Sequence, residues 1–136
     1  MRNQLILKNH YRPPHSGNAR TFAGKSYPQH LQLLFICSRN QWRSPTAEAI
    51  FNKYPHVARS AGTAPSARIR AGEKLIAWAD IIFVMEKKHR RQLQEKFAPA
   101  LEGKPVIVLD IPDDYGFMDE ELIRILEDAV PPYLPE

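Results

Sequence analysis

Four short apolar runs, each followed by a segment long enough for a helix, constrain the fold of this chain more than any other feature of its sequence. The runs are rich in Ile, Val, Leu and Phe, as buried parallel strands are, and they cover Leu31–Cys37, Val57–Thr63, Asp80–Met85 and Pro105–Ile111. Because strands alternate with helices, the sequence predicts an α/β fold. We expect a three-layer sandwich in which a four-stranded parallel sheet carries helices on both faces through right-handed crossovers.

The segments after these runs show helical periodicity. The predicted helices cover residues 44–54, 68–79, 87–101 and 119–130. In the first helix Ser44 is a candidate N-cap, Pro45 takes the first helical position, and Tyr54 ends the apolar stripe. In the second helix Ile69 is among the residues that we expect to be buried.

Residues 1–30 differ from the rest of the chain. They contain Pro13, Pro14, Pro28 and no carboxylate, and apart from Leu5–Leu7 they show no sustained period. We interpret residues 1–30 as a basic, flexible N-terminal extension and residues 31–136 as one globular domain. A basic arm for RNA or DNA, or a start codon placed too far upstream, are the alternatives.

The charge of the chain is unevenly distributed. Residues 1–47 carry seven basic residues and no acidic one, whereas residues 48–136 carry 12 basic and 15 acidic residues. Such a local positive field attracts anions: nucleic acid, a phosphorylated small molecule or a phosphorylated protein. No stretch approaches the roughly 18 apolar residues that a membrane-spanning helix requires, so we expect a cytoplasmic protein.

Cys37 is the only cysteine, so it forms no internal disulfide and no cysteine-rich zinc site. It is either a buried filler or a nucleophile. Cys37 ends the first apolar run and is followed six residues later by Arg43 and then by Ser44, which gives the pattern C-x5-R-S between a strand and a helix. The pattern is typical of the phosphate loop of cysteine phosphatases.

Each part of this pattern has a physical reason. The five residues Ser38, Arg39, Asn40, Gln41 and Trp42 can curl so that their backbone N–H groups converge on one anion at the positive end of the new helix. The planar guanidinium of an arginine binds two phosphoryl oxygens at once, which lysine cannot do. The same positive surroundings favour the thiolate form of a cysteine, which is the nucleophile.

From about Leu31 to Tyr133 the chain resembles the low-molecular-weight protein tyrosine phosphatase family, particularly its short bacterial members. The family pattern C-x-G-N-x-C-R-S-P is matched here by Cys37, Asn40, Arg43, Ser44 and Pro45. Asp113 and Tyr115 match the family's D-P-Y segment, and residues 60–63 match its S-A-G-T. The resemblance implies a sheet of order 2-1-3-4 and hydrolysis of phosphomonoesters through a phosphocysteine, without a metal or other cofactor. The partners it implies are a phosphorylated protein, or a small phosphomonoester, and inorganic phosphate or sulfate in the loop.

These roles leave several choices open. Cys37 attacks phosphorus and Arg43 with the loop amides stabilises the transferring group. Ser44 either donates to the sulfur or only caps the helix, while Asn40 holds the loop in a left-handed backbone conformation. The leaving group needs a proton, for which Asp113 is the first candidate and Asp114 the second. Asp110 is interpreted as structural, and Tyr115 either walls the pocket or packs on the domain surface.

The chain departs from the family pattern at four places. Arg39 stands where the family has Gly, Trp42 where it often has a second cysteine, and Asp114 where it has Pro. The stretch Ala64–Arg70 is short beside the family's substrate-flanking loop. With Trp42 in place of the second cysteine, no protective disulfide forms.

Three other functions fit parts of the sequence. Thioredoxin-coupled arsenate reductases need further cysteines, and phosphocarrier proteins lack the loop arginine. A non-catalytic module that binds a phosphorylated ligand or RNA remains as the alternative. His56 and His89 have no partner at metal-ligand spacing, and we interpret the run Lys87–Arg91, which includes His89, as a solvated helix face that could otherwise bind RNA.

Overall fold

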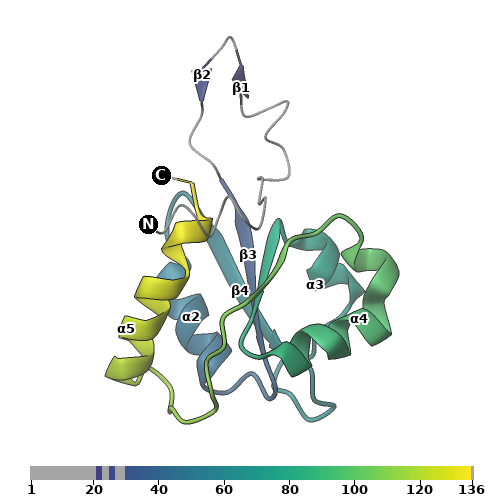
Figure 1. The fold of residues 1–136 in the computed structure, drawn as a ribbon, viewed down its shortest axis with the longest axis vertical. Helices are drawn as coiled ribbons and strands as arrows, with labels where there is room; N and C mark the ends of the chain where they lie inside the picture. The colour runs from purple at the N-terminus through teal and green to yellow at the C-terminus, as the bar shows by residue number, and fades with distance from the viewer. Residues whose placement is uncertain (1–20, 23–24, 27–29, 136) are drawn as a thin grey trace.

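The computed structural model describes residues 21–22, 25–26 and 30–135 of the chain (Figure 1). The described strands are β1 (Thr21–Phe22), β2 (Lys25–Ser26), β3 (Gln32–Cys37), β4 (Val57–Gly62), β5 (Ile81–Val84) and β6 (Val106–Val108). The helices are α2 (Arg43–Phe51), α3 (Glu73–Trp78), α4 (Lys87–Leu101) and α5 (Glu120–Ala129), followed by the 3₁₀ turn η1 (Pro131–Tyr133).

The main sheet confirms the predicted topology. Its strand order is β4-β3-β5-β6 and all three pairings are parallel, so the four predicted strands lie in the order 2-1-3-4. In this sheet β3 lies between β4 and β5, with Phe35 opposite both Ser60 and Phe83. The reversal of strand order beside β3 is where ligands bind in open α/β sheets.

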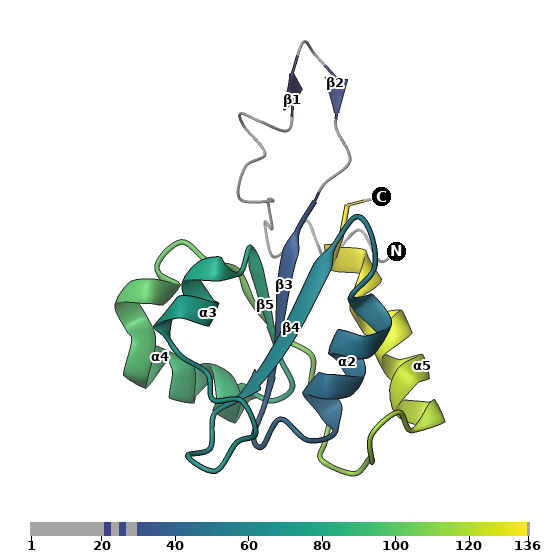
Figure 2. The same cartoon turned by 180° about the vertical axis from the view of Figure 1, so that it is seen from behind.

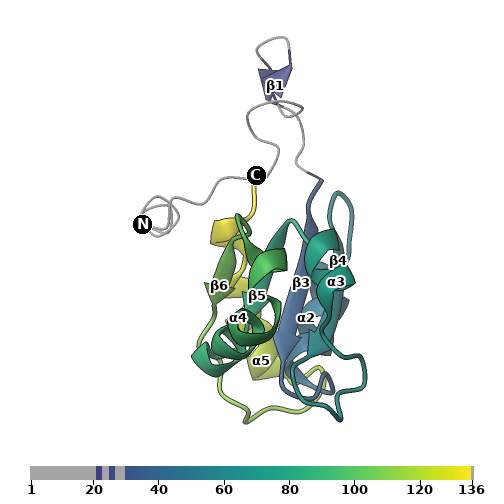
Figure 3. The same cartoon turned by 90° about the vertical axis from the view of Figure 1, so that its right-hand side faces the viewer.

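Helices cover both faces of the sheet, as predicted. Figure 3 shows α3 and α4 on one side of the strands and α2 and α5 on the other. Each face has its own hydrophobic core, because every residue of β5 is buried and β3 sends alternate side chains to the two faces.

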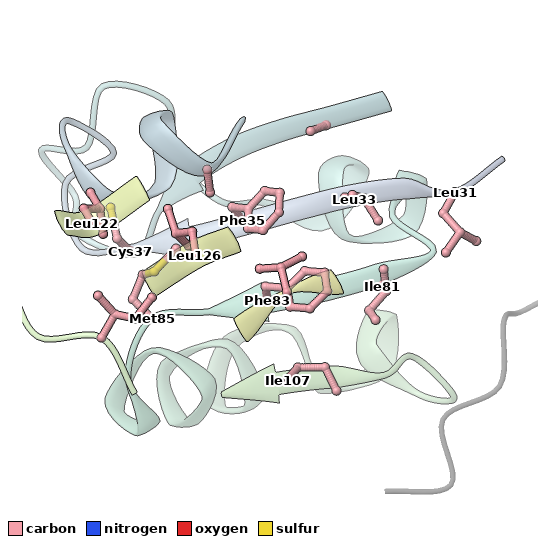
Figure 4. Close-up of a cluster of buried hydrophobic side chains, with 14 residues drawn as sticks. Leu31, Leu33, Phe35, Cys37, Ile81, Phe83, Met85, Ile107, Leu122 and Leu126 are labelled. Atoms are coloured by element: carbon pink, nitrogen blue, oxygen red, sulfur yellow. The ribbon is translucent and has the colours of Figure 1, made fainter. Parts of the chain in front are cut away.

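The core under α2 and α5 is held by stacked aromatic rings. The ring of Phe35 stacks on Phe83 at a centroid distance of 5.1 Å and on Phe51 at 5.7 Å. Figure 4 shows that Cys37 lies at one end of this cluster, where β3 finishes, near Leu122 and Met85. The apolar core therefore brings the cysteine to the carboxyl edge of the sheet.

The first predicted helix begins and ends earlier than expected. It starts at Arg43, with Trp42 as N-cap, so Ser44 is not the N-cap and Pro45 is the third helical residue. It ends at Phe51, and Tyr54 is 83% exposed instead of buried. The residue before a proline avoids helical backbone, and Tyr54 precedes Pro55, so the chain turns there to begin β4.

The second predicted helix is also shorter, because α3 begins only at Glu73. The residues before it continue the sheet: Gly62 N donates to Ile69 O and Ala71 N donates to Gly62 O, both at 2.8 Å. This pairing leaves Ile69 41% exposed, so its predicted burial was wrong.

The fourth strand is also shorter than predicted, because it covers only Val106–Val108. Asp110, which we expected within the apolar run, is exposed beyond the end of this strand and has a φ of 58°.

Most of the predicted N-terminal extension, and with it the prediction that it is flexible, lies outside the described residues. Within residues 1–30 the structure describes one antiparallel pair that the sequence did not predict, in which Thr21 pairs with Ser26 and Phe22 with Lys25. Among the described residues no helix is both long and apolar enough to cross a membrane.

Candidate active site

Three loops meet at the carboxyl edge of the sheet, at the lower end of the molecule in Figures 1 and 2. The first is the phosphate loop, by which we mean residues 38–42 between β3 and α2. The segment after β4 bonds to it, because Thr63 N donates to Cys37 O and Arg68 N to Arg39 O, each at 3.0 Å. The segment after β6 is the acid loop, residues 112–117, which carries Asp113.

Cys37 lies at the base of the phosphate loop with 3% of its surface exposed. Its Sγ is 3.0 Å from Ser44 Oγ and accepts a bond from Asn40 N at 3.3 Å. Ser44 therefore contacts the sulfur, the first of the two roles that its position in the sequence left open. Polar hydrogens directed at a sulfur stabilise negative charge on it.

Asn40 is the centre of the hydrogen bonds that shape the loop. It is fully buried and has a φ of 58°, the left-handed conformation expected for it. Its Nδ2 donates to Ser44 Oγ at 2.9 Å and to Ser60 Oγ at 2.8 Å, and Ser60 in turn donates to Glu48 Oε1 at 2.5 Å. A chain of polar groups thus runs from Glu48 through Ser60, Asn40 and Ser44 to the sulfur.

Gly62 allows β4 to approach the phosphate loop closely. A Cβ at this position would lie 2.4 Å from Ser38 O, 2.7 Å from Ala67 Cβ and 3.0 Å from Asn40 N. Two of these three atoms are loop backbone. Only a glycine fits between the end of the strand and the loop.

Arg43 is 2% exposed, and one nitrogen of its guanidinium, Nη1, is hydrogen-bonded to two protein groups. Nη1 donates to Glu86 Oε2 at 2.5 Å and to Ile111 O at 2.8 Å, while Nε lies 3.6 Å from Asp113 Oδ1. Burial pushes the pKa of Glu86 upward, but the hydrogen bond and charge of Arg43, together with Lys88 and His89, lower the pKa overall. Within the described part of the chain, Nη2 has no hydrogen bond to protein, so the edge formed by Nε and Nη2 is the one that can face an oxyanion.

The candidate acids lie at the surface beside this arginine. Asp113 and Asp114 are both exposed, and Asp113 forms the ion pair with Arg43. Tyr115 is half-buried and packs against the core beneath α2 and α5, while its hydroxyl donates to Glu121 Oε2 at 3.4 Å. Desolvation, followed by the negative charge of Glu121, raises the pKa of Tyr115.

His89 is not on a solvated helix face, so this part of the prediction for Lys87–Arg91 was wrong. It is fully buried: Nδ1 accepts from Glu86 N at 3.0 Å, and Nε2 is 2.8 Å from Ser38 Oγ in the phosphate loop. Because Nδ1 is an acceptor, the neutral ring carries its proton on Nε2 and donates to Ser38. Burial, with Arg43 nearby, lowers the pKa of His89 to about 4.

The remaining loop side chains face outward. Arg39, Gln41 and Trp42 are exposed, Trp42 by 48% of its surface. Gln41 lines a cavity of about 410 Å³ together with Arg68 of the β4–α3 segment and Phe117 of the acid loop. In the part of the chain that the structure describes, no group of three His, Cys, Asp or Glu side chains could hold a metal ion.

Sequence reasoning missed four residues of this site: Glu48, Ser60, Thr46 and Glu86. Ser60 was noted only within the S-A-G-T resemblance, and Thr46 donates to Trp42 O at 2.6 Å. One signal was available for Glu86 and His89. They stand at the N-cap and third positions of α4 and form a reciprocal capping box, which fixes both side chains at the end of β5.

No protein-family model and no curated protein matches this sequence, but solved structures match its fold. YwlE arginine phosphatase from Geobacillus stearothermophilus matches with a TM-score of 0.57 and 18% identity over 76% of this chain and 88% of that one. The tyrosine phosphatase Wzb from Escherichia coli K30, in complex with phosphate, matches with a TM-score of 0.60 and 22% identity over 74% and 94%. A low molecular weight protein tyrosine phosphatase from T. tengcongensis matches with a TM-score of 0.58 and 21% identity over 76% and 95%. The chain therefore has the fold of the low-molecular-weight protein tyrosine phosphatases.

Proposed function

We propose that this protein is a cysteine-dependent phosphatase of the protein tyrosine phosphatase type, which hydrolyses phosphomonoesters through a phosphocysteine on Cys37. The observation that carries the proposal is the joint placement of a sulfur and a guanidinium. Cys37 Sγ lies within 3.3 Å of both Ser44 Oγ and Asn40 N, at the base of a loop that leads directly into Arg43. Glu86 and Ile111 accept from Nη1 of that arginine and Asp113 lies near its Nε, so Nη2 is left for the phosphoryl group.

In the first step the thiolate of Cys37 attacks phosphorus and the bond from phosphorus to the leaving oxygen breaks. Arg43 and the amides of residues 38–42 stabilise the phosphoryl oxygens, and the positive end of α2 adds to this field. The leaving oxygen takes a proton from the carboxylic acid of Asp113. The contact of Asp113 with Arg43 Nε, at 3.6 Å, supports this choice over Asp114.

In the second step water attacks the phosphocysteine. Asp113, now a carboxylate, takes a proton from the water as the sulfur–phosphorus bond breaks and inorganic phosphate forms. Ser44 donates to the departing sulfur, which its 3.0 Å contact with Sγ allows. Apart from the substrate and water, both steps use only side chains and backbone amides of this chain.

For the substrate we propose phosphotyrosine in a protein, with small phosphomonoesters as alternatives. Wzb from E. coli K30, described as a tyrosine phosphatase, has been solved with phosphate and with sulfate, which supports binding of these anions in the loop. YwlE is described as an arginine phosphatase, so the fold does not fix the leaving group. Tyr115, two residues after Asp113, is the aromatic side chain that the acid loop carries beside the proposed acid, and it is half-buried against the core with its hydroxyl on Glu121 Oε2.

Turnover of p-nitrophenyl phosphate by the full chain, in the presence of EDTA, tests the proposal. We expect Cys37→Ser and Arg43→Ala each to lower kcat/KM by more than about a thousandfold, because each removes a group that acts on phosphorus. Cys37→Ser should still be stabilised thermally by inorganic phosphate, since the loop amides remain. Arg91→Ala, which alters an exposed arginine of α4, is the matched control and should leave turnover unchanged.

Residual turnover by Cys37→Ser would contradict the phosphocysteine. Binding of phosphate by the wild-type chain without turnover of any substrate would instead favour the non-catalytic phosphate-binding module. Comparing a phosphotyrosine peptide with a phosphoarginine peptide then decides the substrate class, and a higher kcat/KM on phosphoarginine would overturn the assignment to phosphotyrosine.

A further inference from the structure

The first turn of α2 is attached to both ends of the acid loop. Where that loop begins, Arg43 Nη1 donates to Ile111 O at 2.8 Å, and Ile111 is 1% exposed with its own N–H bonded to Met85 O. Where the loop ends, Met118 N donates to Thr46 Oγ1 at 2.8 Å. The exposed residues Asp113 and Asp114 lie between these two attachments.

Thr46 makes a second hydrogen bond, to the phosphate loop. It is fully buried, and its hydroxyl donates to Trp42 O at 2.6 Å while it accepts from Met118 N. Trp42 O already accepts the backbone N–H of Thr46 at 3.0 Å, so the start of α2 does not need the hydroxyl. For Met118 N the hydroxyl is the partner that the structure provides, and losing it would leave a partly buried donor unsatisfied.

The backbone at Met118 is in a conformation that needs support. Its φ is 60°, the left-handed region that side chains other than glycine rarely adopt. The next residue, Asp119, is the N-cap of α5 and accepts from Glu121 N and Leu122 N, which fixes the chain on the far side. On the side that leads back to Asp113, Asp119 N donates to Gly116 O at 3.2 Å within the turn itself, and Thr46 is the hydrogen-bond partner that ties this side to α2.

We propose that Thr46 is a positioning residue, whose hydroxyl joins the phosphate loop to the acid loop and sets where the carboxylic acid of Asp113 stands above the phosphoryl group. The inference rests on the proposed function and deepens it. A proton donor is effective only within hydrogen-bond reach of the leaving oxygen, so a small displacement of the acid loop costs rate. Thr46 touches neither substrate nor sulfur, and it acts through Asp113.

Two substitutions at Thr46 separate this role from a purely structural one. Valine has the same shape without the hydroxyl, and serine keeps the hydroxyl without the methyl group. With phenyl phosphate, whose leaving group needs a proton, we expect Thr46→Val to lower kcat about tenfold more than with p-nitrophenyl phosphate, and to change KM by less than about twofold. Thr46→Ser should restore most of the loss with phenyl phosphate.

The opposite pattern would overturn the inference. Equal losses of kcat with both substrates, or a Thr46→Ser variant as impaired as Thr46→Val, would show that the hydroxyl serves stability or packing and not the acid. Thermal melts of the three proteins check that each is folded before its rates are compared.

Amide hydrogen exchange separates failure of this inference from failure of the proposed function. In Thr46→Val the amide of Met118 should exchange at least about fivefold faster than in wild type, while the amide of Ile111, held by Met85 O, should not change. An unchanged Met118 amide would overturn the inference even if the enzyme is active. A wild-type chain that turns over no substrate would overturn the proposed function, whatever the exchange at Met118.

Discussion

Asp113 and Asp114 are adjacent and both exposed, yet their surroundings differ. Asp113 Oδ1 lies 3.6 Å from Arg43 Nε, the arginine that we propose binds the phosphoryl group. In the proposed mechanism, a carboxyl group beside that arginine would lie near the oxygen that leaves. The sequence lacks the family's proline at position 114, which left Asp113 and Asp114 as two candidates. The ion pair with Arg43 is a structural reason to prefer Asp113.

We expect Asp113→Asn to lower kcat on phenyl phosphate by about a hundredfold, and by clearly less on p-nitrophenyl phosphate, whose leaving group departs nearly unprotonated. The same change should flatten the basic limb of the pH–rate curve. Asp114→Asn, one residue away and equally exposed, is the matched control and should do neither. A leaving-group dependence that appears only in Asp114→Asn would move the acid by one residue.

The contact of Ser44 with the sulfur of Cys37 was predictable, because the two residues belong to one continuous segment of the chain. Residues that support the loop from other segments were not predictable in the same way. Ser60 contacts Asn40 because of the register of β4 against β3, and Glu48 of α2 in turn accepts a hydrogen bond from Ser60. His89 was misassigned because the four basic residues around it are exposed, and only its place in the capping box of α4 indicated that this one side chain is buried.

At the scale of single elements, the contact between the end of β4 and the phosphate loop is the tightest that the structure describes for a glycine. We expect Gly62→Ala to lower the free energy of unfolding by about 1–3 kcal/mol, because Ser38 O or the loop backbone must move. It should also weaken phosphate binding, since the amides of the loop move with it. Urea unfolding and the thermal shift with phosphate measure both effects.

Gly72→Ala is the control for this change, since a Cβ at Gly72 meets no atom within 4 Å. Because Gly72 is the N-cap of α3 and alanine is a poorer cap than glycine, the change should lower the free energy of unfolding by about 0.5 kcal/mol. Equal free energies of unfolding for Gly62→Ala and Gly72→Ala would show that the loop accommodates the extra methyl group without loss of stability. The close approach of β4 to the loop would then not require a glycine.

The elements themselves were largely predictable, and the differences have identifiable causes. All four strands and all four helices of the main domain were found, with the bounds of α4 correct, because buried parallel strands and amphipathic helices leave strong patterns. The ends of other elements moved where a tertiary contact decided them. α2 ends at Phe51, where the side chain of Asn52 accepts from Ala58 N of β4, and the pairing of residues 69–71 with Gly62 delays α3.

At the scale of the whole molecule, His89 makes stability depend on pH. The folded chain holds the pKa of His89 at about 4, against an ordinary value of 6.5, because burial and then Arg43 disfavour the charged ring, while Glu86 and Asp113 act against this shift. Between pH 6.5 and about 4 the unfolded chain therefore binds a proton that the folded chain does not. The uncharged His89 therefore contributes fully to the free energy of unfolding above pH 6.5. This contribution is lost as the pH falls from 6.5 to about 4, and below pH 4 the loss does not grow further.

We expect this loss to be on the order of 3 kcal/mol, because the pKa falls from 6.5 to about 4 and each pKa unit corresponds to about 1.4 kcal/mol. Urea unfolding of wild type and His89→Gln between pH 4 and 7 measures it, because carboxyl groups that titrate in the same range cancel in the difference. His30→Gln, which changes an exposed histidine, should leave the pH dependence of wild type intact. Parallel curves for wild type and His89→Gln would contradict the burial of an uncharged ring.

The boundary of the domain stays a prediction. The sequence sets the start of the folded domain near Leu31, and β3 begins at Gln32, but most of residues 1–30 lie outside the described part of the chain. Their basic character is visible in the sequence, whereas their relation to the domain depends on contacts that no local pattern encodes.

The half-exposed Trp42 gives the chain an optical label at the phosphate loop. The sequence contains one other tryptophan, Trp78, whose indole lies under the Arg59 guanidinium at 4.5 Å from the ring centroid, on α3 and away from the loop. Replacing Trp78 by phenylalanine would leave a protein with a single tryptophan, one residue before the arginine that we propose binds the phosphoryl group. Emission from that indole then follows occupancy of the loop during a titration or a single turnover, without any dye attached to the protein.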